Sequence, residues 1–261
     1  MRQTYPHLEH IVVDAGSTDA TESIVRASPA RFIAAPGARQ AAAVNRGVAE
    51  SAADVVMVLN ADDVLYDGGV TALVDALATA PDALAAYGEA VHIDAGGARI
   101  APYPTKPFDP AALIEECYIC HPASAVRRAA FDAAGGLDEH LDVVLDYDFW
   151  IRLSRRGSFV RTGALIAGSR MHPANKTLSR RGDVYREAFR VLHRHYGYVP
   201  YGWIVGYASW LLHRGDQFLT APSRSPLTAL LALALGLRSN PLQALRYLRD
   251  WYAHRAIARQ R

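Results

Sequence analysis

The sequence predicts an α/β protein, a mixed sheet flanked by helices and followed by a C-terminal helical extension. Two segments carry this prediction, because in each an apolar run ends abruptly in polar and acidic side chains. They are 11–21 (IVVDAGSTDAT) and 55–63 (VVMVLNADD). As a third observation, the chain becomes more basic and richer in aromatic residues from about residue 183. We therefore predict two domains, 1–182 and 183–261.

The expected elements alternate between strands and helices through the first domain. In chain order they are a strand at 9–14, a helix at 18–27, a strand at 31–34, a helix at 38–51, a strand at 54–60, a helix at 69–79, a strand at 84–93, and helices at 128–135 and 146–156. Ser17, Thr18 and Asp19 are N-cap candidates for the first helix. The segment 94–97 (DAGG) predicts a hairpin turn. The β-branched and aliphatic run 55–59 is typical of a strand buried on both faces of a mainly parallel sheet.

Asn60, Asp62 and Asp63 follow that strand directly. Open α/β sheets bind ligands beyond the carboxyl ends of their strands. Two adjacent carboxylates repel each other unless a cation lies between them, and hard oxygen ligands suit Mg²⁺ or Mn²⁺, which would neutralise a diphosphate. In the alternative interpretation, Asp62 and Asp63 only cap the next helix. The motif alone leaves both interpretations open.

Asp14 ends the first strand in the same way, before a glycine turn. Its carboxylate could hydrogen-bond a base or ribose. In an ordinary strand-to-helix turn it would instead satisfy backbone amides. We therefore treat Asp14 as a candidate nucleotide-binding residue with a structural alternative.

Four segments together resemble the motifs of bacterial family 2 glycosyltransferases of the GT-A type. They are 11–21, then 45–47 with 59–63, then 126–128 with 135–139 (GGLDE), and finally 146–153 (DYDFWIRL). They occur in the family's order over roughly residues 4 to 180, and this combination is more specific than any single motif. The resemblance implies transfer of a sugar from a nucleoside diphosphate-sugar to an acceptor hydroxyl.

The resemblance also implies roles for the polar residues after the strand at 54–60. Asp62 corresponds to the metal ligand that clamps the diphosphate, with Mn²⁺ or Mg²⁺ as the cofactor. Asn60 corresponds to the acid near the ribose, where the family more often has Asp, so Asn60→Asp is expected to be tolerated. Asp63 is expected to be structural.

Inverting transfer needs a base that takes the acceptor proton, and the resemblance places this base at Asp146. Leu145 precedes it where the family usually has Glu. An alternative role for Asp146 is to cap the helix that follows. Asp148 and Arg152 stand four residues apart on the same helix and predict a structural ion pair.

Two further segments resemble parts of the family's site. His172, in 169–179 (SRMHPANKTLS), would complete the metal shell as a neutral imidazole. Arg170 would meet the departing diphosphate. Arg39, in a glycine-bearing loop, would approach the nucleotide. Without this resemblance, the sequence would predict only that Arg39 is a solvated loop residue.

The composition agrees with a cytoplasmic enzyme. A formal net charge of +2 over 261 residues does not suggest a nucleic-acid-binding protein. The two cysteines, Cys117 and Cys120, predict free thiols in a reducing cytosol, and the first six residues lack the apolar core of a signal peptide. The family usually has a first strand and helix before 3–10 (QTYPHLEH), and we expect the DNA upstream of Met1 to encode them.

The C-terminal extension 183–261 is basic and rich in aromatic residues, with eleven arginines and three acids after Tyr185. Its apolar run 226–237 is too short to span a bilayer. Basic amphipathic helices can lie in a membrane interface, here at the inner face of the plasma membrane. A helical cap or a dimer contact is an equally open interpretation.

The sequence thus predicts a metal-dependent, inverting glycosyltransferase of bacterial cell-surface polysaccharide or exopolysaccharide synthesis, with a sugar or lipid-linked acceptor. Two interpretations from other classes remain. One is a non-catalytic, truncated glycosyltransferase-like protein that binds a nucleotide-sugar or a partner. The other is a nucleotidyltransferase, although the glycine- and lysine-rich phosphate loop of that class is not seen in the sequence.

Overall fold

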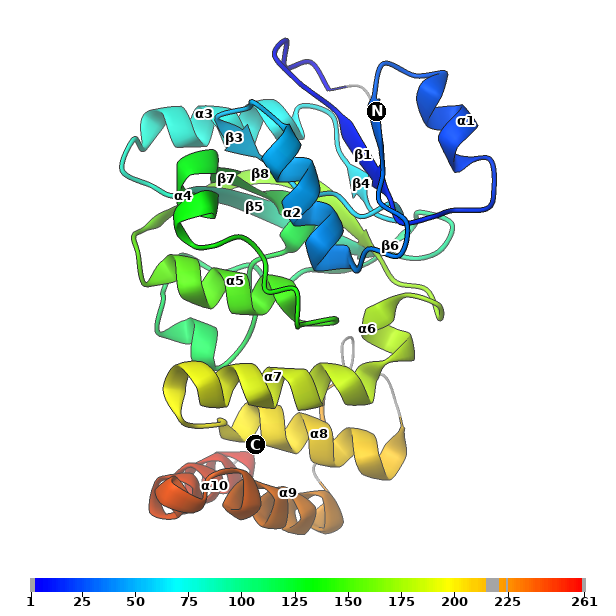
Figure 1. Cartoon of the computed structure of the whole chain (residues 1–261). Helices are drawn as coiled ribbons and strands as arrows, with labels where there is room; N and C mark the ends of the chain where they lie inside the picture. Colours follow the sequence, from blue (N-terminus) through cyan, green and yellow to red (C-terminus); the bar gives the residue numbers. More distant parts are fainter. Residues whose placement is uncertain (1–2, 215–220, 224, 260–261) are drawn as a thin grey trace. The chain divides into compact units, whose positions relative to one another are not determined.

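The computed structural model describes residues 3–214, 221–223 and 225–259 (Figure 1). The chain forms two compact units. The first comprises Met1–Pro110 and Tyr118–His172, and the second comprises Ala111–Cys117 and Pro173–Arg261. The division falls before the predicted boundary at residue 182. The short segment 111–117 belongs to the second unit, where the carbonyl of Ile114 accepts a hydrogen bond from the Trp203 indole at 3.2 Å.

The first unit contains a six-stranded mixed sheet in the order β3-β7-β5-β8-β4, with β6 paired to β5. Its strands are β3 (Val55–Val56), β4 (Val64–Leu65), β5 (Ala85–Ile93), β6 (Arg99–Pro102), β7 (Ser124–Arg127) and β8 (Phe159–Arg170). Within this sheet β5 and β8 run parallel, and every other described pair is antiparallel. The predicted mixed α/β fold is therefore confirmed, whereas the expectation of a mainly parallel sheet is wrong.

The helices of this part of the chain lie at positions close to those predicted. They are α1 (Thr21–Arg26), α2 (Gln40–Glu50), α3 (Gly69–Thr79), α4 (Arg128–Ala133) and α5 (Leu145–Ser154), with two short 3-10 turns, η1 (Ala112–Ile114) in the second unit and η2 (His121–Ala123) in the first. The predicted turn at 94–97 is also present, because the Asp94 amide donates to the Ala98 carbonyl at 2.8 Å and joins β5 to β6.

The strand expected at 54–60 is much shorter than predicted. Only β3, Val55–Val56, pairs with a neighbour, and Val56 is its one buried residue. Val55 and residues 57–59 are only partly buried, and within the described part of the chain no strand pairs with the outer edge of β3. The prediction of a strand buried on both faces is therefore wrong. Residues 57–60 continue as an irregular segment that carries Asn60 toward the site.

The long strand β8 was not predicted. It contains Gly163 and Gly168, and glycine inside a strand weakens the apolar pattern by which strands are found. The structure explains Gly168, because a Cβ there would lie 3.0 Å from a Val64 methyl group and 3.1 Å from Ile93. This close packing lets β8 lie between β5 and β4 and delivers its last residues to the site.

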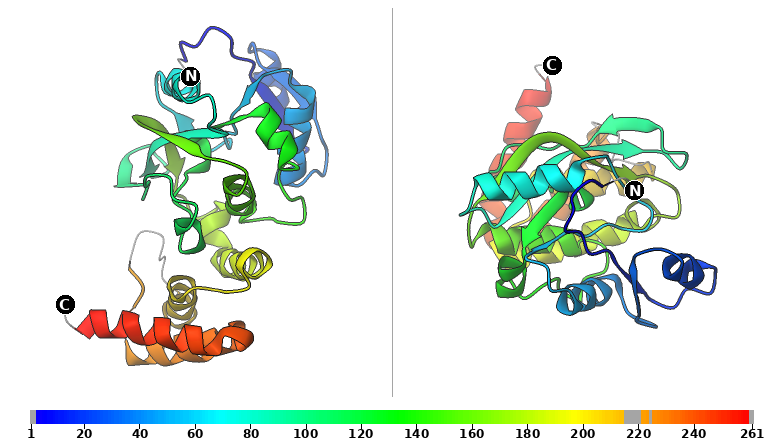
Figure 2. Two further views of the ribbon diagram at one scale, coloured as in Figure 1. Left: turned by 90° about the vertical axis from the view of Figure 1, so that its left-hand side faces the viewer. Right: turned by 90° about the horizontal axis from the view of Figure 1, so that it is seen from above.

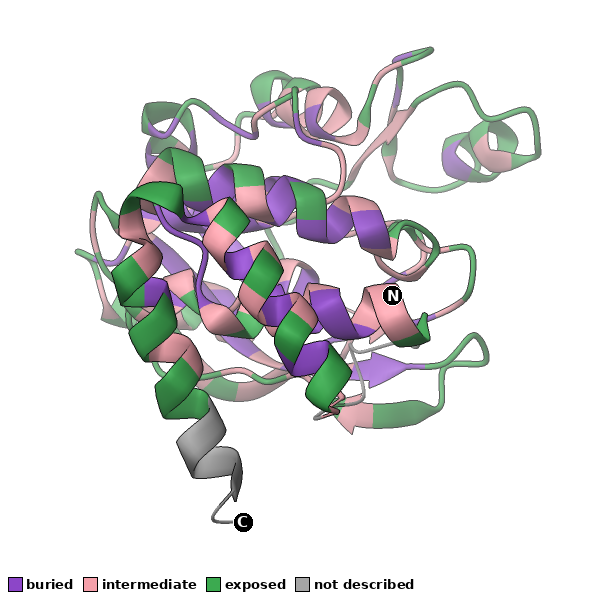
Figure 3. Ribbon diagram, turned by 90° about the horizontal axis from the view of Figure 1, so that it is seen from below, coloured by how far each residue is buried: buried purple, intermediate pink, exposed green. Residues whose placement is uncertain are grey.

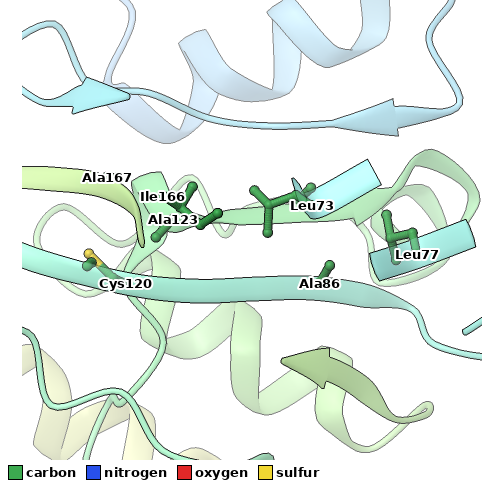
Figure 4. Packing of buried hydrophobic residues seen from close by; sticks show 9 residues of the cluster. Leu73, Leu77, Ala86, Cys120, Ala123, Ile166 and Ala167 are labelled. Carbon is green, nitrogen blue, oxygen red and sulfur yellow. The ribbon is translucent and has the colours of Figure 1, made fainter. Parts of the chain in front are cut away.

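The core lies between α3 and the sheet (Figure 4). Leu73 and Leu77 of α3 pack against small residues of the strands, among them Ala86 and Ala167, and against Ile166. Because alanines leave room for the helix to approach, the leucines become almost fully buried. Burying each such side chain stabilises the fold by roughly 1.5–3 kcal/mol. The rigid sheet then holds the loops that carry the polar site residues.

A second, two-stranded sheet pairs β1 (Ile11–Asp14) with β2 (Arg31–Ala34) in parallel register. Within the described residues, no strand pairs with the other edge of β1 or with the outer edge of β3. α1 lies beside this small sheet at the periphery of the first unit (Figure 2). The expectation of a further strand beside β1 stays a prediction.

The second unit is helical, as predicted for the extension. Its helices are α6 (Lys176–Ser179), α7 (Arg181–Tyr196), α8 (Tyr201–His213), α9 (Pro226–Ser239), the 3-10 turn η3 (Pro241–Gln243) and α10 (Ala244–Arg259). The fully buried Tyr247 of α10 donates its hydroxyl to the Ala232 carbonyl of α9 at 2.8 Å. Among the described residues, we find no helix with the length and apolar character needed to cross a bilayer.

Candidate active site

Asp62 and His172 meet at one edge of the large sheet, although they are far apart in the sequence. Asp62 lies in the turn between β3 and β4, and His172 lies two residues beyond β8. Because β4 pairs with β8, the two side chains converge, and His172 Nε2 lies 3.1 Å from an Asp62 carboxylate oxygen. The Asp62 side chain is 40% exposed. The sequence prediction that these two residues belong to one site therefore has a geometric basis.

Asp63 organises the neighbouring polar residues. One carboxylate oxygen accepts the Asn60 amide at 2.9 Å, and the other accepts the backbone N–H of Arg170 at 2.8 Å. Asn60 in turn accepts a hydrogen bond from Gln40, the first residue of α2, at 2.8 Å. Burial raises the pKa of Asp63, and the hydrogen bonds from Arg170 and Asn60 oppose that rise. Asp63 therefore has the structural role that was expected.

Arg170 fixes the backbone around Asp62. Its guanidinium donates to the Asp62 carbonyl at 2.6 Å and to the carbonyls of Asp94 and Ala95 at 2.9 and 2.8 Å. These contacts join the acidic turn to the β5–β6 hairpin. In the structure the guanidinium contacts main-chain oxygens. The predicted contact of Arg170 with a departing diphosphate stays a prediction.

Asp146 lies in the first turn of α5 and is half-buried. The N-cap position belongs to Val144, so the alternative that Asp146 caps this helix is wrong. One of its carboxylate oxygens accepts the Tyr147 N–H at 2.8 Å. The predicted structural pair is present one turn further on, where Arg152 Nε lies 2.7 Å from a carboxylate oxygen of the fully buried Asp148.

His121 is a site residue that the sequence prediction missed. It begins the short turn η2, and its ring meets Trp150 edge to face, with the centroids 6.2 Å apart. Burial lowers the pKa of His121, whereas the negative charges of Asp146 and Asp63 raise it. His121 is therefore near both acids. It also lines a small cavity of mainly apolar residues with Trp150. A lone histidine before a proline offers no periodic signal that could have identified it.

Arg39 and Asp14 make local contacts. Arg39 donates to the Glu139 carbonyl at 3.3 Å and lies 3.7 Å from the Asp142 carboxylate, so it holds the segment that leads to α5. Asp14 accepts the backbone N–H groups of Gly16 and Ser17 at 3.0 and 2.9 Å. Hydrogen bonds from Ser17 lower the pKa of Asp14. This is the turn geometry of the structural alternative, and the nucleotide-binding roles of both residues stay predictions.

The donor set suits a divalent ion that also binds phosphate. Within the described residues, no three side chains of His, Cys, Asp or Glu gather closely enough to hold a metal by themselves. The paired carboxylate of Asp62 and imidazole of His172 would supply two ligands. Mg²⁺ commonly takes only one or two carboxylates from protein and the rest from phosphates and water. The residues present therefore fit an ion that arrives with a diphosphate.

Comparison with known proteins identifies related sequences. A family model described as Glycosyl transferase family 2 matches residues 1–135. The chain is 29% identical to the O-antigen biosynthesis protein RfbC of Myxococcus xanthus over 157 residues, which are 60% of this chain and 12% of that protein. It is 32% identical to a PGL/p-HBAD biosynthesis glycosyltransferase of Mycobacterium bovis over 163 residues, which are 58% of this chain and 60% of that protein. The chain thus spans less than two thirds of the length of either relative.

Solved structures show the same fold. The crystal structure of Staphylococcus aureus TarS residues 1–349 with UDP has a TM-score of 0.57 at 14% identity and covers 95% of this chain and 84% of that chain. The mannosyltransferase PcManGT of Pyrobaculum calidifontis, in complex with GDP-Man and Mn²⁺, has a TM-score of 0.54 at 18% identity and covers 96% and 79%. The predicted GT-A fold is confirmed by these likenesses.

Proposed function

Because the chain belongs to glycosyl transferase family 2, we propose that its site transfers a sugar from a nucleoside diphosphate-sugar to an acceptor hydroxyl. The observation that carries this proposal is the meeting of Asp62 with His172, 3.1 Å apart, beside the network of Asp63. Such a pair suits an ion bound to a diphosphate. The nucleotide complexes of TarS and PcManGT support the same class of donor.

Asp62 and His172 would hold Mn²⁺ or Mg²⁺, which when bound neutralises the charge of the diphosphate. Asn60, which is held by hydrogen bonds with Gln40 and Asp63, would orient the donor's nucleoside. Asp14 and Arg39 would approach the nucleotide, and Arg170 keeps the acidic turn in place. In this proposal Arg170 supports the turn that carries Asp62, and the other residues bind or orient the donor.

Asp146 is the proposed general base. Its carboxylate would accept the proton of the acceptor hydroxyl as that oxygen attacks the anomeric carbon, and the bond to the diphosphate breaks on the opposite face. The product therefore has inverted anomeric configuration. Asp146 lies in the first turn of α5, where one of its carboxylate oxygens accepts the Tyr147 N–H at 2.8 Å and so holds the side chain in place.

The names of the relatives support a place in bacterial surface polysaccharide or glycolipid synthesis. We therefore propose a sugar or lipid-linked acceptor and a cytoplasmic site of action, where nucleotide-sugars are available. The alternative of a non-catalytic nucleotide-sugar-binding protein rests on one observation, the separation of the β1–β2 sheet from the six-stranded sheet. The nucleotidyltransferase interpretation has no such support.

Release of nucleoside diphosphate from a series of nucleotide-sugars tests the proposal. We expect Asp146→Asn, which keeps the shape but cannot take a proton, to lower turnover by about a hundredfold or more. Donor affinity should change little. Asp75→Asn on α3, which is exposed, is the matched control and should retain full turnover. Near-normal turnover in Asp146→Asn would move the base elsewhere. Donor binding without turnover in the unmodified chain would favour the non-catalytic alternative.

A further inference from the structure

Helices α9 and α10, with the turn η3 between them, expose a set of apolar and basic side chains. We call this set the α9–α10 surface; it comprises Leu227, Leu230, Arg238, Leu242, Leu245, Arg246, Leu248, Arg249 and Tyr252. Figure 3 shows exposed residues in the part of α10 that precedes the grey C-terminal segment. We propose that this surface binds the headgroup and upper acyl region of an anionic lipid membrane.

The apolar members are unusually exposed. Leu242 is 97% exposed, Leu245 81% and Tyr252 72%, while Leu227 and Leu230 are 61% and 60% exposed. Single exposed leucines are ordinary, but a gathered set marks a surface that meets another apolar phase. These leucines and the tyrosine therefore need a partner that can take up apolar side chains.

Helical spacing places the exposed residues of each helix on one face. In α10, Leu245, Leu248, Arg249 and Tyr252 are separated by three or four residues, and so are Leu227, Leu230, Ala234 and Arg238 in α9. The opposite face of α10 is committed to the fold, since Tyr247 is fully buried and the Trp251 indole donates to the Ala229 carbonyl at 3.1 Å. The exposed face can therefore bind a membrane without loss of internal packing.

The charges on this surface are basic. Arg238, Arg246 and Arg249 are exposed, and Arg246 is held against the Tyr198 ring, 3.9 Å from its centroid. From residue 221 to 261 the sequence has seven arginines and one acid, Asp250. The Asp250 carboxylate accepts a hydrogen bond from the Tyr198 hydroxyl, so its charge is directed toward the fold of the unit. A leucine and tyrosine face with flanking arginines matches an anionic headgroup layer.

The same charges argue against a second copy as the occupant. A two-fold contact that paired this surface with itself would bring the arginines of one copy close to those of the other, and none of the residues that we assign to the surface is acidic. A bilayer satisfies both components, because acyl chains take up the leucines and anionic phosphates pair with the arginines. The helices would lie in the interface, since none of those described can span the membrane.

Co-sedimentation of the full chain with vesicles tests the inference without any donor or acceptor, so its result is independent of the proposed reaction. We expect binding to phosphatidylglycerol-containing vesicles, weaker binding to pure phosphatidylcholine vesicles, and weakening as salt is added. Leu242→Asp with Leu245→Asp should lower the apparent affinity at least about tenfold. Arg249→Glu should lower it by roughly fivefold.

The controls change the same residue types elsewhere. Ile24→Asp replaces an exposed apolar residue of α1, and Arg156→Glu reverses an exposed arginine just after α5. Both should bind vesicles like the unmodified chain, and circular dichroism should show that all variants are folded. Absence of vesicle binding, or equal binding by the Leu242/Leu245 variant, would overturn the inference. So would a dimer in sedimentation analysis that this variant abolishes.

Discussion

At the residue scale, the Asp62–His172 pair makes metal binding testable apart from turnover. Removal of either side chain would take away half of the proposed donor set, because the described residues include no cluster of three ligands. We expect Asp62→Ala to lower Mn²⁺-dependent binding of a nucleoside diphosphate by more than the roughly 10–100-fold that loss of an outer-shell partner costs. Calorimetric titration with and without Mn²⁺ measures this effect.

The control for that titration is Asp82→Ala, which removes an exposed acid before β5. It should bind like the unmodified chain. His172→Ala should weaken the metal-dependent part of binding while leaving metal-free binding unchanged. Unchanged Mn²⁺-dependent affinity in Asp62→Ala would show that the ion, if bound, is held elsewhere.

Asn60 shows where the structure alters an expectation from the sequence. Family resemblance predicted that Asn60→Asp would be tolerated. The Asn60 amide, however, donates to the buried Asp63 carboxylate at 2.9 Å, and an aspartate there would oppose two negative charges. We now expect Asn60→Asp to destabilise the first unit by about 1–3 kcal/mol at neutral pH.

The destabilisation caused by Asn60→Asp should depend on pH in a defined direction. Burial already raises the pKa of Asp63, and a second carboxylate raises it further. A carboxyl with a raised folded-state pKa contributes stability below its unfolded pKa, and this stability is lost as pH rises through the folded pKa. The difference in urea unfolding free energy between Asn60→Asp and the unmodified chain should therefore be smaller near pH 4 than at pH 7. An equal difference at both values would exclude this charge repulsion.

At the element scale, Gly236 lets α9 and α10 approach. A Cβ at this position would lie 1.9 Å from the Tyr247 ring, which is fully buried. Gly236→Ala should therefore destabilise the second unit by roughly 1–3 kcal/mol, in spite of the better helix propensity of alanine. Thermal unfolding followed by circular dichroism measures the change.

Gly202→Ala in α8 is the matched comparison. The nearest described atom to a Cβ there is a Glu115 carboxylate oxygen at 4.0 Å, so alanine fits without a clash. We expect this variant to be as stable as the unmodified chain or more stable by up to about 1 kcal/mol. Equal behaviour of the two glycine variants would contradict the packing argument.

The sequence predicted helices better than strands, and the reasons are visible in particular elements. The helix at 69–79 and the strand at 31–34 were predicted with their observed bounds, because apolar periodicity and turn residues mark them clearly. β8 was missed because its glycines serve close packing, which a single sequence does not reveal. Asp62 and His172 could be proposed through family motifs, whereas His121 depends on a three-dimensional neighbourhood that no local pattern encodes.

At the scale of the whole molecule, two compact units predict separable responses to ligand. If a nucleoside diphosphate with Mn²⁺ binds the folded first unit, as we propose, it stabilises that unit by mass action, by about 2.7 kcal/mol at a concentration of 100 Kd. We expect hydrogen exchange to slow in segments such as 55–65 and 159–172 and to stay unchanged in α9 and α10. Mass spectrometry of peptides measures this. Uniform slowing across both units would show that they unfold together.

The division of the chain into two units also determines which segments must be exchanged together in a chimera of related enzymes. The second unit is not only the C-terminal part of the chain. It also contains residues 111–117, which lie in sequence between the two parts of the first unit, and the Trp203 indole donates a hydrogen bond to the Ile114 carbonyl. A chimera joined after His172 keeps the imidazole beside Asp62. In that chimera, however, residues 111–117 of this chain would pack against the helices of a different protein. Transplanting the helices of another family member therefore requires two grafts, one at 111–117 and one from residue 173 onward.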